Sequence, residues 1–136
     1  MVKAIDAASL PKPKFLYSPM VVAGPFLKTA GLVGIDITTG KLVAGGVGPE
    51  SKCILRNLRE AMSECGLQLH DMVSANIYLS DFQQFPSFNQ EWEDFFSGID
   101  TPPARTSVGV QCLPIDASIE MDFLFYASDL NAHLEV

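Results

Sequence analysis

The stretch Val73-Ser74-Ala75-Asn76-Ile77-Tyr78-Leu79 alternates apolar with polar side chains, which is the pattern of a strand in a half-buried sheet. A second pattern follows, in which Phe85, Phe88, Trp92 and Phe95-Phe96 recur at helical spacing. Successive side chains of a strand point to opposite faces, whereas those of a helix return to one face every three or four residues. We therefore expect a strand whose apolar face begins with Val73, followed by a helix that buries its aromatic side.

The segments before this unit predict more strands and a first helix. Segments 17–23 and 26–30 are β-rich, and segment 35–43 has the pattern of a hairpin around Thr39-Gly40. The first helix is predicted to begin near Pro49 and to end at Gly66. An apolar stripe at helical spacing supports it, formed by Ile54, Leu58, Ala61, Met62 and Cys65.

Two final strands are expected at 105–112 and 118–127, separated by Leu113-Pro114. In the first, Arg105, Ser107 and Gly109 share one face, and Cys112 is expected on the other, buried face. The element order predicts an α+β fold, with two helices packed on one face of a mixed sheet. We expect a single domain over 1–136, with an N-terminal arm at 1–14 and a loose tail at 128–136.

Composition restricts the classes of function. Apolar residues make up 48% of the 136, which is typical of a folded domain with a core. A formal net charge of −7 argues against a nucleic-acid surface, which needs clustered basic side chains. No apolar run is long enough for a signal peptide or a membrane span, and three cysteines fit a reducing compartment. We therefore expect a cytoplasmic protein that binds neither nucleic acid nor membrane.

Arg105 is the most informative single residue. The chain has three arginines, of which Arg56 and Arg59 fall on a predicted helix surface, whereas Arg105 follows a double-proline turn into a partly buried strand. A guanidinium is costly to desolvate without a partner, and its flat fork fits a carboxylate in bidentate fashion. Two interpretations remain open: Arg105 forms an ion pair with Glu120 or Asp122, or it binds an acidic ligand.

The predicted sheet has a side that the two helices do not cover. Apolar or small residues are expected on that side, among them Leu124, Gly109 and Ala30. An exposed apolar sheet of this extent usually marks an oligomer interface. We therefore expect a closed ring or a symmetric dimer.

A series of short motifs resembles the Rid/YjgF family of enamine and imine deaminases over about residues 15–127. The most specific part is Pro103-Ala104-Arg105 followed by Leu113-Pro114 and Ile119-Glu120. Weaker matches, in the same order, are Tyr17-Ser18-Pro19, Thr29-Ala30-Gly31, Thr39-Gly40, Asn57-Leu58, Asp81-Phe82, Phe88-Asn89 and Phe95-Phe96.

The resemblance implies a chorismate-mutase-like (YjgF-like) fold and a homotrimer with three active-site clefts between subunits. It implies that Arg105 binds the substrate carboxylate and that Glu120 orients or activates the hydrolytic water. Gly31 and Ser107 would offer main-chain contacts near the imine. Tyr17 and Asn89 would line the cleft, although Asn89 could equally tether its own helix and Tyr17 could be an interface aromatic. Neither a metal nor an organic cofactor belongs to this chemistry.

The function that the resemblance implies is hydrolysis of reactive enamine or imine acids, which releases ammonia and a 2-keto acid. Arg105 and Glu120 each begin the polar face of a terminal strand, so we expect the two charges to meet across a cleft. The alternatives are a trimeric small-carboxylate-binding protein with little catalysis and, more weakly, a ribonuclease or translation inhibitor.

The chain also departs from the family pattern. Ala30-Gly31-Leu32 stands where Ser-Gly-Gln is common, Gly34 replaces a usual proline, Ser107 replaces a typical cysteine, and Gly109 stands where a glutamate often occurs. Ala30 and Leu32 make the cleft floor more apolar, and Gly109 is expected to leave space on the Arg105 face. These departures favour a bulkier or more apolar substrate, such as an amino-dienoate, over small 2-iminobutyrate-type acids.

Overall fold

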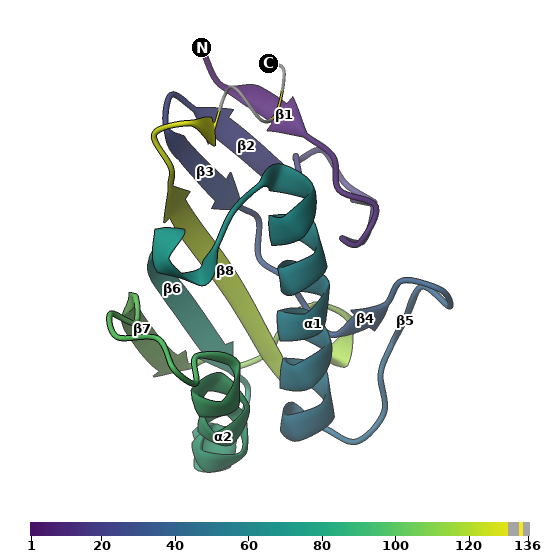
Figure 1. Ribbon diagram of the computed structural model, residues 1–136. Coiled ribbons are helices and arrows are strands. Elements are labelled where there is room, and N and C mark those ends of the chain that lie inside the picture. The colour runs from purple at the N-terminus through teal and green to yellow at the C-terminus, as the bar shows by residue number, and fades with distance from the viewer. Residues whose placement is uncertain (131–133, 135–136) are drawn as a thin grey trace.

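A six-stranded sheet with two helices on one face forms the body of the protein in this computed structural model, which describes residues 1–130 and Leu134 (Figure 1). The strands are antiparallel to their neighbours except for the parallel pair β6–β7. In spatial order they are β1 (Lys3–Ile5), β2 (Met20–Ala23), β3 (Phe26–Thr29), β8 (Ile119–Tyr126), β6 (Met72–Leu79) and β7 (Ala104–Gly109). This arrangement confirms the predicted α+β fold.

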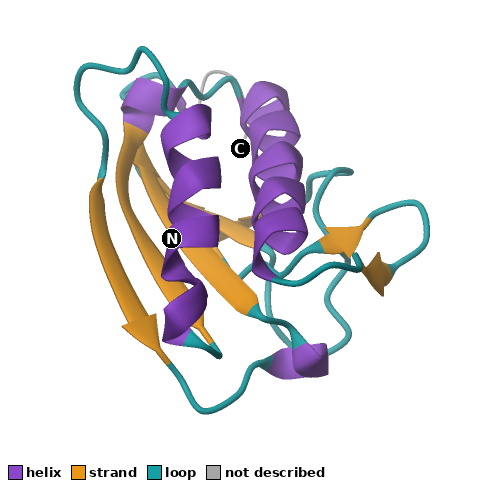
Figure 2. Cartoon of the chain, turned by 90° about the horizontal axis from the view of Figure 1, so that it is seen from below, coloured by secondary structure: helices purple, strands orange, loops and turns teal. Residues whose placement is uncertain are grey.

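The helices α1 (Val47–Cys65) and α2 (Phe85–Phe95) lie side by side on the same face of the curved sheet (Figure 2). Gly66 adopts the left-handed conformation at the end of α1, as predicted. The Gly66 N–H group donates to the Ser63 carbonyl and the Leu67 N–H group donates to the Met62 carbonyl, which satisfies these terminal acceptors. The predicted hairpin forms a separate two-stranded sheet, β4 (Ile35–Asp36) and β5 (Lys41–Leu42). The described residues also form three short 3₁₀ helices: η1 (Leu69–Asp71), η2 (Phe82–Gln84) and η3 (Pro114–Asp116).

The core lies between the sheet and the two helices. From β8 it receives Ile119, Met121, Phe123 and Phe125, all with no exposed surface, and from α1 the predicted apolar stripe is buried. Val73 does not belong to this face, contrary to the prediction, and is 42% exposed. A β-bulge between Met72 and Ser74 turns it outward, because two residues of β6 there oppose one of β8.

β7 is an edge strand and is shorter than expected. It ends at Gly109, so Cys112 lies beyond the sheet and is exposed, not buried as predicted. Gly109 was also expected on the uncovered side, but it pairs with Leu79 and therefore faces the helices. A side-chain carbon at Gly109 would lie 3.4 Å from Cβ of Phe82, which is ordinary van der Waals contact, and Gly109 is exposed.

The sheet face opposite the helices is uncovered in the chain. Its exposed apolar side chains include Phe26, Val108 and Tyr126, each at least 40% exposed. Phe26 and Tyr126 make an edge-to-face contact with ring centroids 5.2 Å apart. Assembly of copies through this face stays a prediction.

The two ends of the described chain differ in their packing. The N-terminal arm supplies the edge strand β1, and Leu10 is buried. Most of the predicted loose tail lies outside the described residues, but Leu130 within it is 1% exposed and packs against the core. Among the described residues, no helix has the length and apolar character needed to cross a membrane.

Candidate functional site

Arg105 faces the helices, because its partner in the parallel register with β6 is the buried Ala75. Its guanidinium carbon lies 5.2 to 5.4 Å from the ring centroids of Phe85, Phe88 and Trp92, all on α2. Such contacts orient an arginine over aromatic faces while its N–H groups stay available. Desolvation lowers the pKa of Arg105, and the nearby Glu93 acts in the opposite direction.

Asn89 fixes the direction of this guanidinium. The Nη1 group of Arg105 donates a hydrogen bond of 2.9 Å to Oδ1 of Asn89, and Nδ2 of Asn89 donates one of 3.3 Å to Glu93. Among the described residues Arg105 makes no ion pair, so the alternative of a structural pair with Glu120 or Asp122 is wrong. The guanidinium is held in place by a neutral partner.

Ser107 lies on the same face of β7 as Arg105, two residues along the strand. Its hydroxyl oxygen is buried and has no hydrogen-bond partner among the described residues. A buried hydroxyl group that lacks a hydrogen-bond partner destabilises the folded protein by about 1–3 kcal/mol. Ser107 carries this cost on the same strand face as the charged Arg105. Arg105, Asn89 and Ser107 form what we call the arginine half-site.

Glu120 lies on the other face of the sheet. Its partner on β6 is Tyr78, whose neighbours Ile77 and Leu79 face the helices, so Glu120 points to the uncovered side. Desolvation by burial raises the pKa of Glu120, and the negative charge of Asp122 raises it further. A raised pKa means that the carboxylate holds a proton more readily, which suits a group that takes up and returns a proton.

Gly31 packs directly against the Glu120 carboxyl group. A side-chain carbon at Gly31 would overlap with Oε2 of Glu120. The close approach is fixed by a bridge in which the backbones of Leu32 and Met121 exchange hydrogen bonds of 2.7 and 3.0 Å. Glycine at this position therefore leaves the room that the carboxyl group occupies.

Glu120 and Gly31 line a cavity of about 630 Å³ together with Tyr17. The other lining residues are mainly apolar, as expected for Ala30 and Leu32, and three lysines add positive charge. In full they are Pro11, Lys12, Lys14, Phe15, Pro19, Ala30, Leu32, Val33, Ile35, Gly40, Lys41, Leu42, Pro114 and Ile115. Tyr17, Gly31 and Glu120, with this cavity, form the glutamate half-site.

The two half-sites do not meet within one chain, so the expectation that Arg105 and Glu120 meet across a cleft between subunits stays a prediction. β6 lies between β7 and β8, and the register places the two side chains on opposite faces of the sheet. Arg105 does not line the cavity that contains Glu120. The structure thus groups Tyr17 with Gly31 and Glu120, and Asn89 with Arg105 and Ser107.

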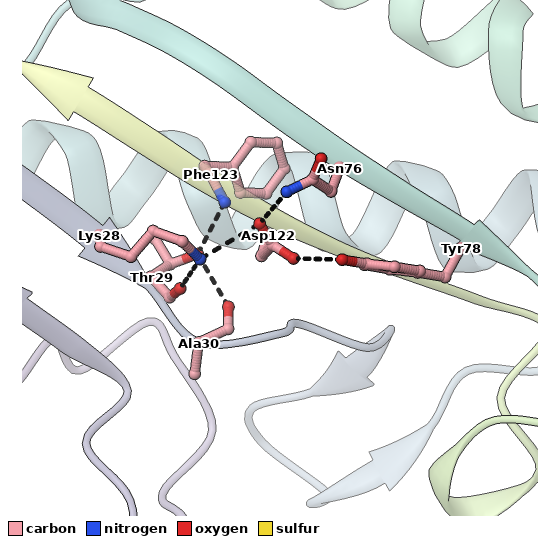
Figure 3. Close-up of polar contacts among 7 residues, drawn as sticks. All are labelled: Lys28, Thr29, Ala30, Asn76, Tyr78, Asp122 and Phe123. Atoms are coloured by element: carbon pink, nitrogen blue, oxygen red, sulfur yellow. Dashed lines mark hydrogen bonds and ion pairs between the residues drawn. The ribbon is translucent and has the colours of Figure 1, made fainter. Parts of the chain in front are cut away.

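Sequence reasoning assigned no role in the reaction to two acidic groups that the structure shows to be buried or half-buried, Glu50 and Asp122. Glu50, on the first turn of α1, is 2% exposed and accepts a 2.8 Å hydrogen bond from the Ser118 N–H group. Asp122 accepts hydrogen bonds from three side chains of β3 and β6 (Figure 3). Asp122 shares a strand face with Glu120, and that spacing was the available signal.

The cysteines do not line the cavity, although Sγ of Cys53 lies 3.3 Å from the carbonyl oxygen of the lining residue Ile35. Cys53 and Cys65 are buried on α1, and burial raises the pKa of Cys65 to about 11. At neutral pH that thiol is protonated and therefore a poor nucleophile.

Comparison with known proteins gives consistent matches over nearly the whole chain. The sequence model of the family described as Endoribonuclease L-PSP matches residues 7–126. A RutC family protein of Pyrococcus abyssi is 34% identical over 124 residues, which cover 91% of this chain and 96% of that protein. A 2-iminobutanoate/2-iminopropanoate deaminase of Dermatophagoides farinae is 30% identical over 121 residues, covering 88% and 92%. The crystal structure of E. coli TdcF with bound serine has a TM-score of 0.85 at 25% identity, covering 93% and 99%.

Proposed function

The chain belongs to the endoribonuclease L-PSP family, also called Rid/YjgF, and on that premise we propose that it is a hydrolytic deaminase of enamine and imine carboxylic acids. The observation that carries the proposal is the state of Arg105, whose guanidinium is oriented by Asn89 and three aromatic rings without an ion pair among the described residues. A fixed guanidinium of this kind suits bidentate binding of a carboxylate. The relative of D. farinae carries the name of an imine deaminase.

The proposed reaction begins when Arg105 binds the carboxylate of a 2-imino acid. This contact fixes the electrophilic imine carbon relative to the protein. Glu120 accepts a proton from a water molecule while the water oxygen bonds to that carbon and the electron pair of the C=N bond moves to nitrogen. Glu120 then returns the proton to nitrogen, which gives a tetrahedral carbinolamine. Glu120 next accepts the proton of the new hydroxyl group and passes it to the amine while the C=O bond forms and the C–N bond breaks, so that ammonia and a 2-keto acid leave.

This chemistry needs both half-sites at one substrate, and the fold of one chain keeps them on opposite faces of the sheet. We propose that the active site forms between copies in a homotrimer, with the arginine half-site of one protomer facing the glutamate half-site of the next. The uncovered sheet face, with its exposed apolar side chains, supports assembly of this kind.

The cavity supports a substrate larger than 2-iminobutyrate. Ala30, Leu32, Ile35 and Leu42 give it an apolar wall beside Glu120. An apolar wall gains free energy when it buries an apolar side chain of the substrate, at about 25 cal/mol per Å². We expect branched, aromatic or diene-containing imino acids to be better substrates than short ones.

The experiment is a deaminase assay on 2-imino acids that an amino-acid oxidase generates in the cuvette, with alanine, leucine and phenylalanine as precursors. Arg105→Ala removes charge-assisted hydrogen bonds worth about 1.5–3 kcal/mol, so kcat/KM should fall by roughly 10- to 150-fold. Glu120→Gln removes the general base, so the rate should fall by about 10²- to 10⁴-fold. Arg59→Ala is the matched control, because Arg59 also lies over a ring of α2, 4.5 Å from the centroid of Phe95, but belongs to neither half-site.

A carboxylate-binding protein without catalysis is the second candidate, and the same variants separate the two. A pure binding protein would lose affinity for a 2-keto acid in Arg105→Ala and would be little changed by Glu120→Gln. Only the family's description supports the ribonuclease alternative. The net charge of −7 argues against it, because a nucleic-acid surface needs clustered basic side chains. RNA retardation at physiological ionic strength would support the ribonuclease alternative.

A further inference from the structure

Asp122 is the centre of a polar network on the uncovered face of the sheet (Figure 3). Its Oδ1 atom accepts hydrogen bonds from Lys28 (3.1 Å) and Asn76 (2.9 Å), and its Oδ2 atom accepts one from the Tyr78 hydroxyl (3.1 Å). The Asp122 side chain is 13% exposed, whereas that of Lys28 is 45% exposed. Three donors from two neighbouring strands thus hold one carboxylate in a fixed, largely buried position.

This network lies beside Glu120. Asp122 and Glu120 are two residues apart on β8, so their side chains point to the same face about 7 Å apart along the strand. Tyr78 is the register partner of Glu120 and donates to Asp122, so its side chain lies on the same sheet face as both carboxyl groups. A charge at that distance in a partly buried site acts on its neighbour more strongly than it would in water.

We propose that Asp122 is a positioning residue for the reaction: the Lys28–Asp122–Tyr78 network holds a fixed charge beside Glu120 and thereby controls the proton transfer that Glu120 carries out. The inference depends on the proposed role of Glu120 as the general base.

The direction in which each neighbouring group shifts the pKa of Glu120 follows from the charge of that group. The carboxylate of Asp122 repels a second negative charge on Glu120, which is the direction of the raised pKa of Glu120. Lys28 partly neutralises Asp122, so it opposes that effect from β3. The other charged or titratable groups around Glu120 are Tyr78 on β6 and, in the shared cavity, Lys12, Lys14, Tyr17 and Lys41.

Two variants of nearly unchanged side-chain size should therefore shift the pKa of Glu120 in opposite directions. Asp122→Asn removes the negative charge, so the pKa of Glu120 should fall and the acidic limb of the kcat/KM profile should move to lower pH. Lys28→Met keeps the aliphatic stem but removes the positive charge, so the pKa should rise and the limb should move to higher pH. If Asp122 and Lys28 had only a structural role, both variants would lose activity, and their kcat/KM profiles would not shift in opposite directions along the pH axis.

The experiment combines the pH profile of kcat/KM with a carbon NMR titration of protein labelled at the glutamate side-chain carboxyl carbon. Glu120→Gln identifies the Glu120 signal, because that signal disappears. Lys52→Met is the matched control, since Lys52 pairs with Glu91 at 3.8 Å on the exposed surface of the helices, and it should leave the Glu120 titration unchanged.

Opposite shifts in Asp122→Asn and Lys28→Met, seen in both measurements, are the expected result. Unshifted or parallel titrations, in a protein that loses activity in Glu120→Gln, would overturn the inference alone. Full activity of Glu120→Gln, or an inactive wild type, would overturn the proposed function and the inference together.

Discussion

Arg105 and Glu120 lie on opposite faces of one sheet, with a whole strand, β6, between the strands that carry them. Arg105 pairs with Ala75 on the side covered by the helices, whereas Glu120 pairs with Tyr78 on the uncovered side. No change of rotamer can bring side chains on opposite faces of a sheet into one cleft. The proposed site, which uses both groups, therefore requires a second copy of the chain, and that assembly is a proposal.

Gly31→Ala tests whether the position of the Glu120 carboxyl group matters. The added methyl group would overlap with Oε2 of Glu120 and displace a flexible side chain, so the fold should persist. We expect kcat/KM to fall at least tenfold, which corresponds to about 1.4 kcal/mol of transition-state stabilisation. Gly48→Ala is the control, because nothing lies within 4 Å of a side-chain carbon there. Equal activity of the two variants would refute the assigned position of Glu120.

Asn89→Ala tests whether Arg105 must be oriented. Loss of the 2.9 Å hydrogen bond should cost about 0.5–1.5 kcal/mol and raise KM by roughly two- to tenfold, with a smaller effect on kcat. Gln90→Ala is the control, since Gln90 makes a similar 3.2 Å hydrogen bond on α2, to Asp94, away from Arg105. Unchanged KM in Asn89→Ala would show that the aromatic rings alone hold the guanidinium.

Leu130→Ala tests how far the C-terminal segment belongs to the core. Leu130 is 1% exposed, and truncation of such a side chain should lower the free energy of unfolding by about 2–5 kcal/mol in urea. The exposed Ser128 gives the control variant Ser128→Ala, which should stay within about 0.5 kcal/mol of the wild type. Similar free energies of unfolding for the two variants would mean that this segment contributes little to the stability of the core.

Periodicity was sufficient to predict the elements and the faces of most strands. Alternation in β6 and β8 and helical spacing in α1 and α2 reflect burial, which the sequence records residue by residue. Val73 was misassigned because a bulge shifts the alternation by one residue, and no composition signal marks that bulge. Cys112 was misassigned because β7 ends at Gly109 and because the strand face of Thr106 and Val108 is the uncovered one.

The arrangement of the site was harder to predict, because it depends on which strands are neighbours. Both Arg105 and Glu120 were identified as candidates, but their separation follows from the insertion of β6 between β7 and β8. The Lys28–Asp122 contact joins residues 94 positions apart, and the sequence pattern did not predict it either. Strand order and register are properties of the folded sheet, and a local pattern does not encode them.

The central claim is that each active site takes Arg105 from one protomer and Glu120 from another. The most direct measurement is the activity of a purified assembly formed by coexpression of Arg105→Ala and Glu120→Gln with two different affinity tags. If copies mix randomly in a closed ring, about one quarter of the sites combine two intact halves, so about one quarter of wild-type activity should return. A mixed assembly no more active than either variant alone would contradict the account.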